Sequence, residues 1–187
     1  MTTSPARPKH GSPALGTADP AALRTTSSHW HTLAHIVVDP LPSDWRAQLA
    51  ERLGQRVRRI GPWAELALYG ARLCLDSARE AALPSGAQLR VASLAASLSA
   101  ARTVTEQARF DLPMPFVFMQ SQPSQMLAAL SRHLAWQGDA RFTLCRDRHA
   151  VLQLAQLECS TAGLLIGWVE EDRCTEWWRM VPDRFNY

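Results

Sequence analysis

Ala162-Gly163-Leu164-Leu165-Ile166-Gly167-Trp168-Val169 is a continuously apolar run near one end of the 187-residue chain. A strand buried on both faces of a parallel sheet carries apolar side chains at every position, whereas a half-exposed strand alternates apolar and polar residues. The run therefore predicts a buried central strand, and with it a parallel sheet that is covered by helices on both faces.

Strand and helix patterns alternate along the rest of the chain. Short apolar or β-branched runs predict strands at residues 35–38, 89–94 and 141–145, and a short strand or buried segment at residues 116–119. Helical spacing or capping residues predict helices from Trp45 to near Gly54, at residues 63–83 and 99–110, from Ser124 to before Gly138, and after Asp147. This alternation indicates a layered α/β domain with a mostly parallel sheet.

The two ends of the chain differ from this body. Fifteen of residues 1–28 are Pro, Gly, Ser or Thr, and the larger apolar side chains there are Met1, Leu15 and Leu23. Such a segment buries too little surface to offset its ordering entropy, so we expect a disordered tail followed by one domain at residues 29–187. The sequence pattern of residues 170–187 predicts neither a helix nor a strand. Within this segment, the Trp177-Trp178 pair predicts either a cover for the core or a docking contact with another chain.

The composition indicates which kind of protein this is and which partners are not expected. The chain is 47% hydrophobic and 20% charged, which is typical of a globular protein. Its four cysteines form no C-x-x-C pair, which suits a reducing compartment, and basic and acidic residues are interspersed, so nucleic acid is not the expected partner. No apolar stretch approaches the length of a membrane span and no secretory signal is visible, so we expect a cytoplasmic protein.

Common catalytic and cofactor motifs are missing from the sequence. It contains no G-x-S-x-G, G-x-G-x-x-G or G-x-x-x-x-G-K-[ST], and we expect no cofactor. His29, His31 and His35 fit no common zinc spacing, so no metal site is expected. Asp147 and His149 admit an acid–base pair or, more simply, a helix cap beside a solvent-facing ring.

Several segments resemble β-ketoacyl synthases of the thiolase-like fold. Arg58-Arg59-Ile60 with Trp63-Ala64-Glu65-Leu66-Ala67-Leu68 is similar to the entry to their first long helix, and residues 122–128 to the helix near their dimer axis. Residues 142–145, with His149-Ala150 and residues 153–155, resemble their nucleophile strand and helix. Residues 164–171 resemble the core strand that follows.

The order of these segments matches the N-terminal half of that fold, over residues 36–172. The likeness extends to short ketosynthase-like proteins found beside aryl-polyene and xanthomonadin pigment genes. It implies a three-layer thiolase-like half-domain with a mostly parallel sheet and helices on both faces. Polyketide, aryl-polyene pigment or fatty-acid-type chain assembly is the implied process.

In this family a cysteine thiolate accepts an acyl chain from a carrier protein, and two histidines of the other half-domain stabilise the condensation. Cys145 stands at the nucleophile position, but its neighbours Leu144, Arg146 and Asp147 replace the small residues of the family. If His149 is aligned instead with the family's helix histidine, Leu144 takes the catalytic position. His149 is the sole histidine after Cys145, so the resemblance implies a protein without the catalytic pair.

The resulting expectation is a noncatalytic protein that acts through a full-length ketosynthase, through self-association or through an acyl carrier protein. Arg52, Arg56 and Arg59 would share one face if their stretch stays helical, which predicts either docking of an acidic carrier protein or a solvated face. A small acyltransferase-type enzyme that uses Cys145, and a structural remnant without function, remain as alternatives.

Overall fold

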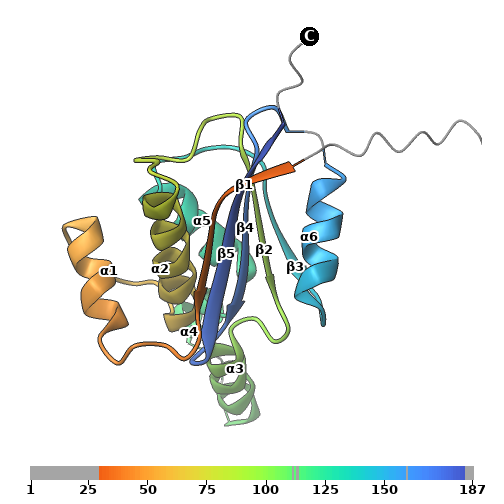
Figure 1. Ribbon diagram of the computed structural model, residues 1–187. Coiled ribbons are helices and arrows are strands. Elements are labelled where there is room, and N and C mark those ends of the chain that lie inside the picture. The colour runs from red at the N-terminus through yellow and green to blue at the C-terminus, as the bar shows by residue number, and fades with distance from the viewer. Residues whose placement is uncertain (1–29, 111, 113, 159, 184–187) are drawn as a thin grey trace, which may run out of the picture.

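The computed structural model describes residues 30–110, 112, 114–158 and 160–183, so the tail expected at residues 1–28 lies outside the described residues. The described chain forms five strands and six helices in an alternating order (Figure 1). The strands are β1 (Trp30–Val38), β2 (Gln88–Ser93), β3 (Ala140–Leu144), β4 (Leu164–Glu170) and β5 (Cys174–Pro182). The helices are α1 (Trp45–Leu53), α2 (Pro62–Ser77), α3 (Leu98–Phe110), α4 (Pro115–Gln120), α5 (Pro123–His133) and α6 (Arg148–Gln156).

The described strands form one sheet in the order β1-β5-β4-β2-β3. Its α/β class is the one expected from the sequence. Parallel pairing joins β2 to β3 and to β4, whereas β5 is antiparallel to both β4 and β1. The sheet is therefore mixed rather than mostly parallel, because a tight turn at residues 171–173 joins β4 directly to β5 and only antiparallel neighbours permit so short a connection.

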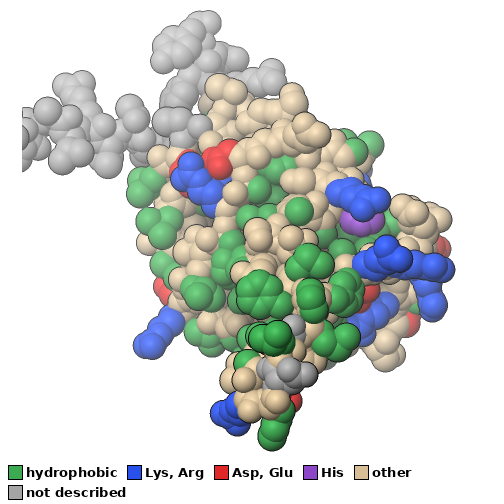
Figure 2. Space-filling view, turned by 180° about the vertical axis from the view of Figure 1, so that it is seen from behind, with side chains coloured by type: hydrophobic (Ala, Val, Ile, Leu, Met, Phe, Trp, Pro, Cys, Tyr) green, Lys and Arg blue, Asp and Glu red, His purple; other side chains and the backbone are tan. Residues whose placement is uncertain are grey.

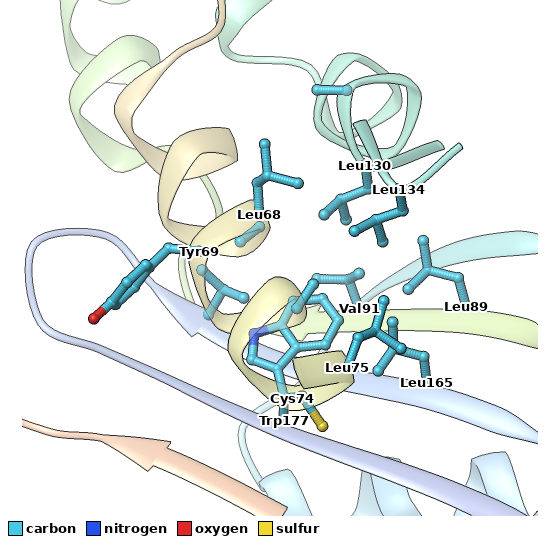
Figure 3. Packing of buried hydrophobic residues seen from close by; sticks show 14 of the residues in the cluster. Leu68, Tyr69, Cys74, Leu75, Leu89, Val91, Leu130, Leu134, Leu165 and Trp177 are labelled. Atoms are coloured by element: carbon cyan, nitrogen blue, oxygen red, sulfur yellow. The ribbon is translucent and has the colours of Figure 1, made fainter. Parts of the chain in front are cut away.

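Helices cover both faces of the sheet and produce three layers (Figure 1). On one face α2 and α5 pack against the strands, and α1 lies outside α2. On the opposite face α6 packs over β4 and β2. Figure 3 shows part of the larger core, where α2 and α5, with the residue that follows α5, contribute Leu68, Leu75, Leu130 and Leu134 and the strands contribute Leu89, Val91, Leu165 and Trp177.

The two consecutive tryptophans of β5 point to opposite faces of the sheet, as alternate residues of a strand must. Trp177 is fully buried in the core under α2, and Trp178 is 8% exposed in the smaller core under α6. The indole of Trp177 fits between two glycines: a Cβ at Gly70 would stand 2.3 Å from it and a Cβ at Gly167 2.5 Å. Both tryptophans therefore cover the core. Of the two predictions made for this pair, a cover for the core and a docking contact with another chain, the structure supports the first.

Several expected elements differ from those observed: β1 begins five residues earlier than expected, α5 ends at His133 rather than just before Gly138, and two further differences are larger. Helix α2 ends at Ser77, six residues before the expected end, because Arg79 takes a left-handed conformation that no helix continues through. Residues 116–119 belong to helix α4 and not to a strand or buried segment. Pro115 occupies the first turn of that helix, where its missing N–H costs nothing, and none of the described α4 residues is buried.

Candidate functional site

The carboxyl ends of β2, β3 and β4 meet at one edge of the sheet, the place where open α/β sheets bind ligands. Cys145 directly follows β3, and its backbone N–H donates to the carbonyl oxygen of Ser93 at the end of β2, at 3.1 Å. Helices α3 and α6 both begin at this edge. The strand-to-helix position expected for Cys145 is therefore the observed one.

The thiol of Cys145 is engaged by the backbone. Its Sγ lies 3.2 Å from the carbonyl oxygen of Asp147, to which it donates. Asp147 caps α6, and its carboxylate accepts from the backbone N–H of His149 at 2.9 Å. A helix cap, and not an acid–base pair, is thus the contact that these two residues make. Within the described residues, no hydrogen bond or ion pair links the thiol to a histidine ring or a carboxylate.

The other two described cysteines have raised pKa values. Burial raises the pKa of the Cys74 thiol to about 12, and the thiol lies 3.9 Å from the carbonyl oxygen of Ala34. Burial, followed by the negative charge of Asp39, also raises the pKa of Cys174. Because the thiolate is the reactive form, neither side chain is suited to nucleophilic chemistry.

Two glutamates at the end of β4 fasten the loop that leads from β2 into α3. Glu170 accepts from the backbone N–H of Leu94 at 2.5 Å and from the hydroxyl of Ser93 at 3.2 Å. Glu171 accepts from both the backbone N–H and the hydroxyl of Ser99, at 2.8 and 2.5 Å. No role was predicted for these two glutamates from the sequence. Two acidic residues at the end of a buried strand were the feature from which one could have been predicted.

Helices α3 and α4 and the connection between them carry a group of exposed apolar side chains, which we call the hairpin surface. Figure 2 shows apolar side chains gathered on this part of the molecule. Exposed fractions range from 91% at Phe110 to 41% at Phe116. The members are Phe110, Leu112, Met114, Phe116, Phe118 and Met119. Monomeric proteins rarely leave so many neighbouring large apolar side chains in water, so this surface indicates a contact with another molecule.

Arg52, Arg56 and Arg59 do not share a helical face, because α1 ends at Leu53 and Gly54 turns the chain in a left-handed conformation. Arg52 is paired with Asp76 at 2.7 Å. Arg56 lines a surface hollow of about 490 Å³ together with Arg58, Arg132 and His133. Arg59 borders a narrow groove beside Phe116 and Met119.

No metal site forms in the described part of the chain. His29 lies outside the described residues, and His35 contacts Glu176 at 2.9 Å and stacks on Trp178 with ring centroids 5.0 Å apart. Among the residues with described positions, no group of three or more His, Cys, Asp or Glu side chains could hold a metal ion. None of the helices described reaches the length and apolar character needed to span a membrane.

Comparison with known proteins gives a likeness of fold. No family model and no curated protein matches the sequence. A solved structure matches with a TM-score of 0.60 at 11% identity, and is described as the ketosynthase ApeO in complex with its chain length factor ApeC from Xenorhabdus doucetiae. The likeness covers 82% of this chain and 79% of the matched chain, so the two chains are of similar length.

Proposed function

We propose that this protein is a noncatalytic, ketosynthase-like subunit that assists polyketide or aryl-polyene chain assembly in the cytoplasm by associating with a ketosynthase. The observation that carries the proposal is the surroundings of Cys145, in a chain whose fold is similar to that of a ketosynthase complex. Assembly of fatty-acid-type chains uses the same condensation, and it belongs to the same proposal.

The chemistry of condensation supports a noncatalytic role. Acyl transfer to a cysteine needs a thiolate, a base to generate it and donors aimed at the developing oxyanion. The thiol of Cys145 donates a hydrogen bond to a backbone carbonyl oxygen, and within the described residues no histidine or carboxylate is bonded to it to act as that base. The guanidinium of Arg148, the first residue of α6, pairs with Glu176 of β5 at 2.5 Å. Its positive charge is therefore directed toward β5 and away from the Cys145 thiol.

Association with another chain is supported by the surface. The hairpin surface leaves six large apolar side chains exposed in the isolated chain. The matched structure is described as a complex of a ketosynthase with a chain length factor, and the chain matched there is of similar length to this one. A ketosynthase is accordingly the partner that we propose, ahead of self-association.

An acidic acyl carrier protein is the second partner of the proposal. Arg52 already shares the carboxylate of Asp76 with Arg72, so the arginines more available to an acidic partner on this side of the molecule are Arg56 and Arg59, with Arg58 and Arg132 nearby. Such charges accelerate the encounter more than they strengthen the complex.

The test combines binding with a search for acylation. We expect the purified chain to form a complex of defined mass with the ketosynthase of its own organism in size-exclusion chromatography with light scattering. Incubation with acyl carrier protein thioesters should leave the intact mass of the chain unchanged. A mass increase that is lost in Cys145→Ala would instead identify an acyltransferase, and a chain that neither binds nor reacts would be a remnant.

A further inference from the structure

The hairpin surface is held outward by specific contacts and is not a loosely attached segment. Glu171 binds Ser99 in the first turn of α3, and the side-chain oxygen of Gln107 accepts from the backbone N–H of Met114 at 3.0 Å. Among the described residues of α3, Ala100 is the buried one. The two helices therefore contribute little to the core of this chain, and α3 extends below the end of the sheet (Figure 1).

Arginine side chains border the hairpin surface on one side. Arg59 lines the same groove as Phe116 and Met119, which joins the border directly to the apolar side chains. Arg56 and Arg58 stand on the same loop and share a hollow with Arg132 of α5. We call these four residues the arginine border. None of them forms an ion pair within the part of the chain that the structure describes, and Figure 2 shows basic side chains beside the apolar ones.

From this juxtaposition we infer that the hairpin surface and the arginine border together form a docking site for a second protein whose contact surface has an apolar centre and an acidic rim. The inference rests on the proposed function and names the contact surface for that partner, the ketosynthase. An apolar centre with a charged rim is the common anatomy of a specific interface.

Charge argues against two other occupants of this docking site, a second copy of this chain and the chain's own residues 1–29. A second copy of this chain would bring its own arginine border against this one across a two-fold axis, and like charges facing each other oppose association. The chain's residues 1–29 hold three larger apolar side chains and carry Arg7, Lys9 and Arg24 against the single acid Asp19. That segment is basic and poor in apolar residues, so it complements neither part of the site.

The test compares matched pairs of exposed apolar side chains. Phe110 and Leu112 are 91% and 85% exposed, so Phe110→Ser with Leu112→Ser leaves the core intact. Leu154 and Leu157 of the α6 region, on the opposite face of the sheet, are 57% and 73% exposed and give the control pair Leu154→Ser with Leu157→Ser. In titrations of the purified ketosynthase followed by biolayer interferometry, we expect the first pair to weaken binding at least about tenfold and the control pair to change it less than about twofold.

A second experiment reverses charges in the arginine border. Arg56→Glu with Arg58→Glu should slow association with the ketosynthase about tenfold at low salt and flatten its dependence on ionic strength. Arg79→Glu, on the exposed turn that follows α2, is the control and should change both much less. Circular dichroism of each variant checks that it is folded.

The outcomes separate this inference from the proposed function. If the ketosynthase binds wild type and both test pairs with equal affinity, the assigned surface is wrong while the association stands. If sedimentation shows a homodimer that Phe110→Ser with Leu112→Ser dissociates, the occupant is a second copy and the inference is overturned. If the chain is monomeric and the ketosynthase does not bind, the proposed function fails as well.

Discussion

Replacement of Trp177 by alanine tests the placement of the C-terminal strand, on which the α/β core depends. The side chain is fully buried, and its indole N–H donates to the hydroxyl of Thr175 at 2.7 Å. Its ring fills the space left by the missing side chains of Gly70 and Gly167. Trp177→Ala therefore opens a cavity that the neighbouring α2 and β4 backbones cannot close without moving.

Truncation of a buried aromatic side chain costs about 3–5 kcal/mol, and complete burial places Trp177 near the upper end, at about 4–5 kcal/mol. Domains of this size are stable by about 5–15 kcal/mol, so the variant should be close to unfolding. Urea unfolding followed by far-ultraviolet circular dichroism measures the loss. A loss below about 2 kcal/mol would contradict the position of Trp177 between the helix layer and the sheet.

A second substitution makes the test specific. In the wild type, Gly167→Ala places a methyl group 2.5 Å from the indole and should destabilise strongly. In the Trp177→Ala background the same methyl group has room, so its cost should disappear and the two changes should be strongly non-additive. Additive losses of free energy would show that Gly167 does not face Trp177.

Three further predictions concern titratable and reactive groups. Iodoacetamide should label Cys145 in the native protein and leave Cys74 unlabelled, because burial raises the Cys74 pKa to about 12; peptide mass spectrometry reads the result. Glu80→Ala should cost about 3–5 kcal/mol in urea unfolding, since it leaves the guanidinium of Arg179, 1% exposed, buried without its carboxylate. Burial, with the nearby charge of Arg132, lowers the pKa of His133 in the folded protein. The unfolded chain therefore binds more protons, and the free energy of unfolding should fall as the pH drops below 6.5. Between pH 5 and 7, the free energy of unfolding should depend less steeply on pH in His133→Gln than in the wild type.

Each of these has a distinct contrary result. Equal labelling of both thiols in the native protein would contradict the burial of Cys74. A neutral effect of Glu80→Ala would mean that Arg179 reaches water. A pH slope that is identical in wild type and His133→Gln would remove the role of that histidine.

The fold was predictable where a local pattern and the tertiary environment agree. The apolar run at residues 162–169 became β4, buried along most of its length, because it pairs with β2 on one side and β5 on the other. The cap at Asp147 was recognisable because capping depends on residues two positions apart. Cys145 stands at the junction where the sequence placed it.

The rest depends on contacts between distant segments. Residues 116–119 have the aromatic and β-branched composition of a strand, yet they form an exposed helix, because apolar character alone does not reveal whether a segment is buried in its own chain. The arginine spacing predicted a shared face, and Gly54 ended the helix first. Glu170 and Glu171 act on residues more than 70 positions away, which no local pattern records.

A noncatalytic role is tested most directly by the products of the ketosynthase, supplied with its carrier protein, extender and starter thioesters and measured by mass spectrometry with and without this chain. We expect added wild-type chain to change the amount or length of the products, and Cys145→Ala to do so equally. Products that are unchanged by the wild type, or an effect that Cys145→Ala abolishes, would contradict a noncatalytic partner.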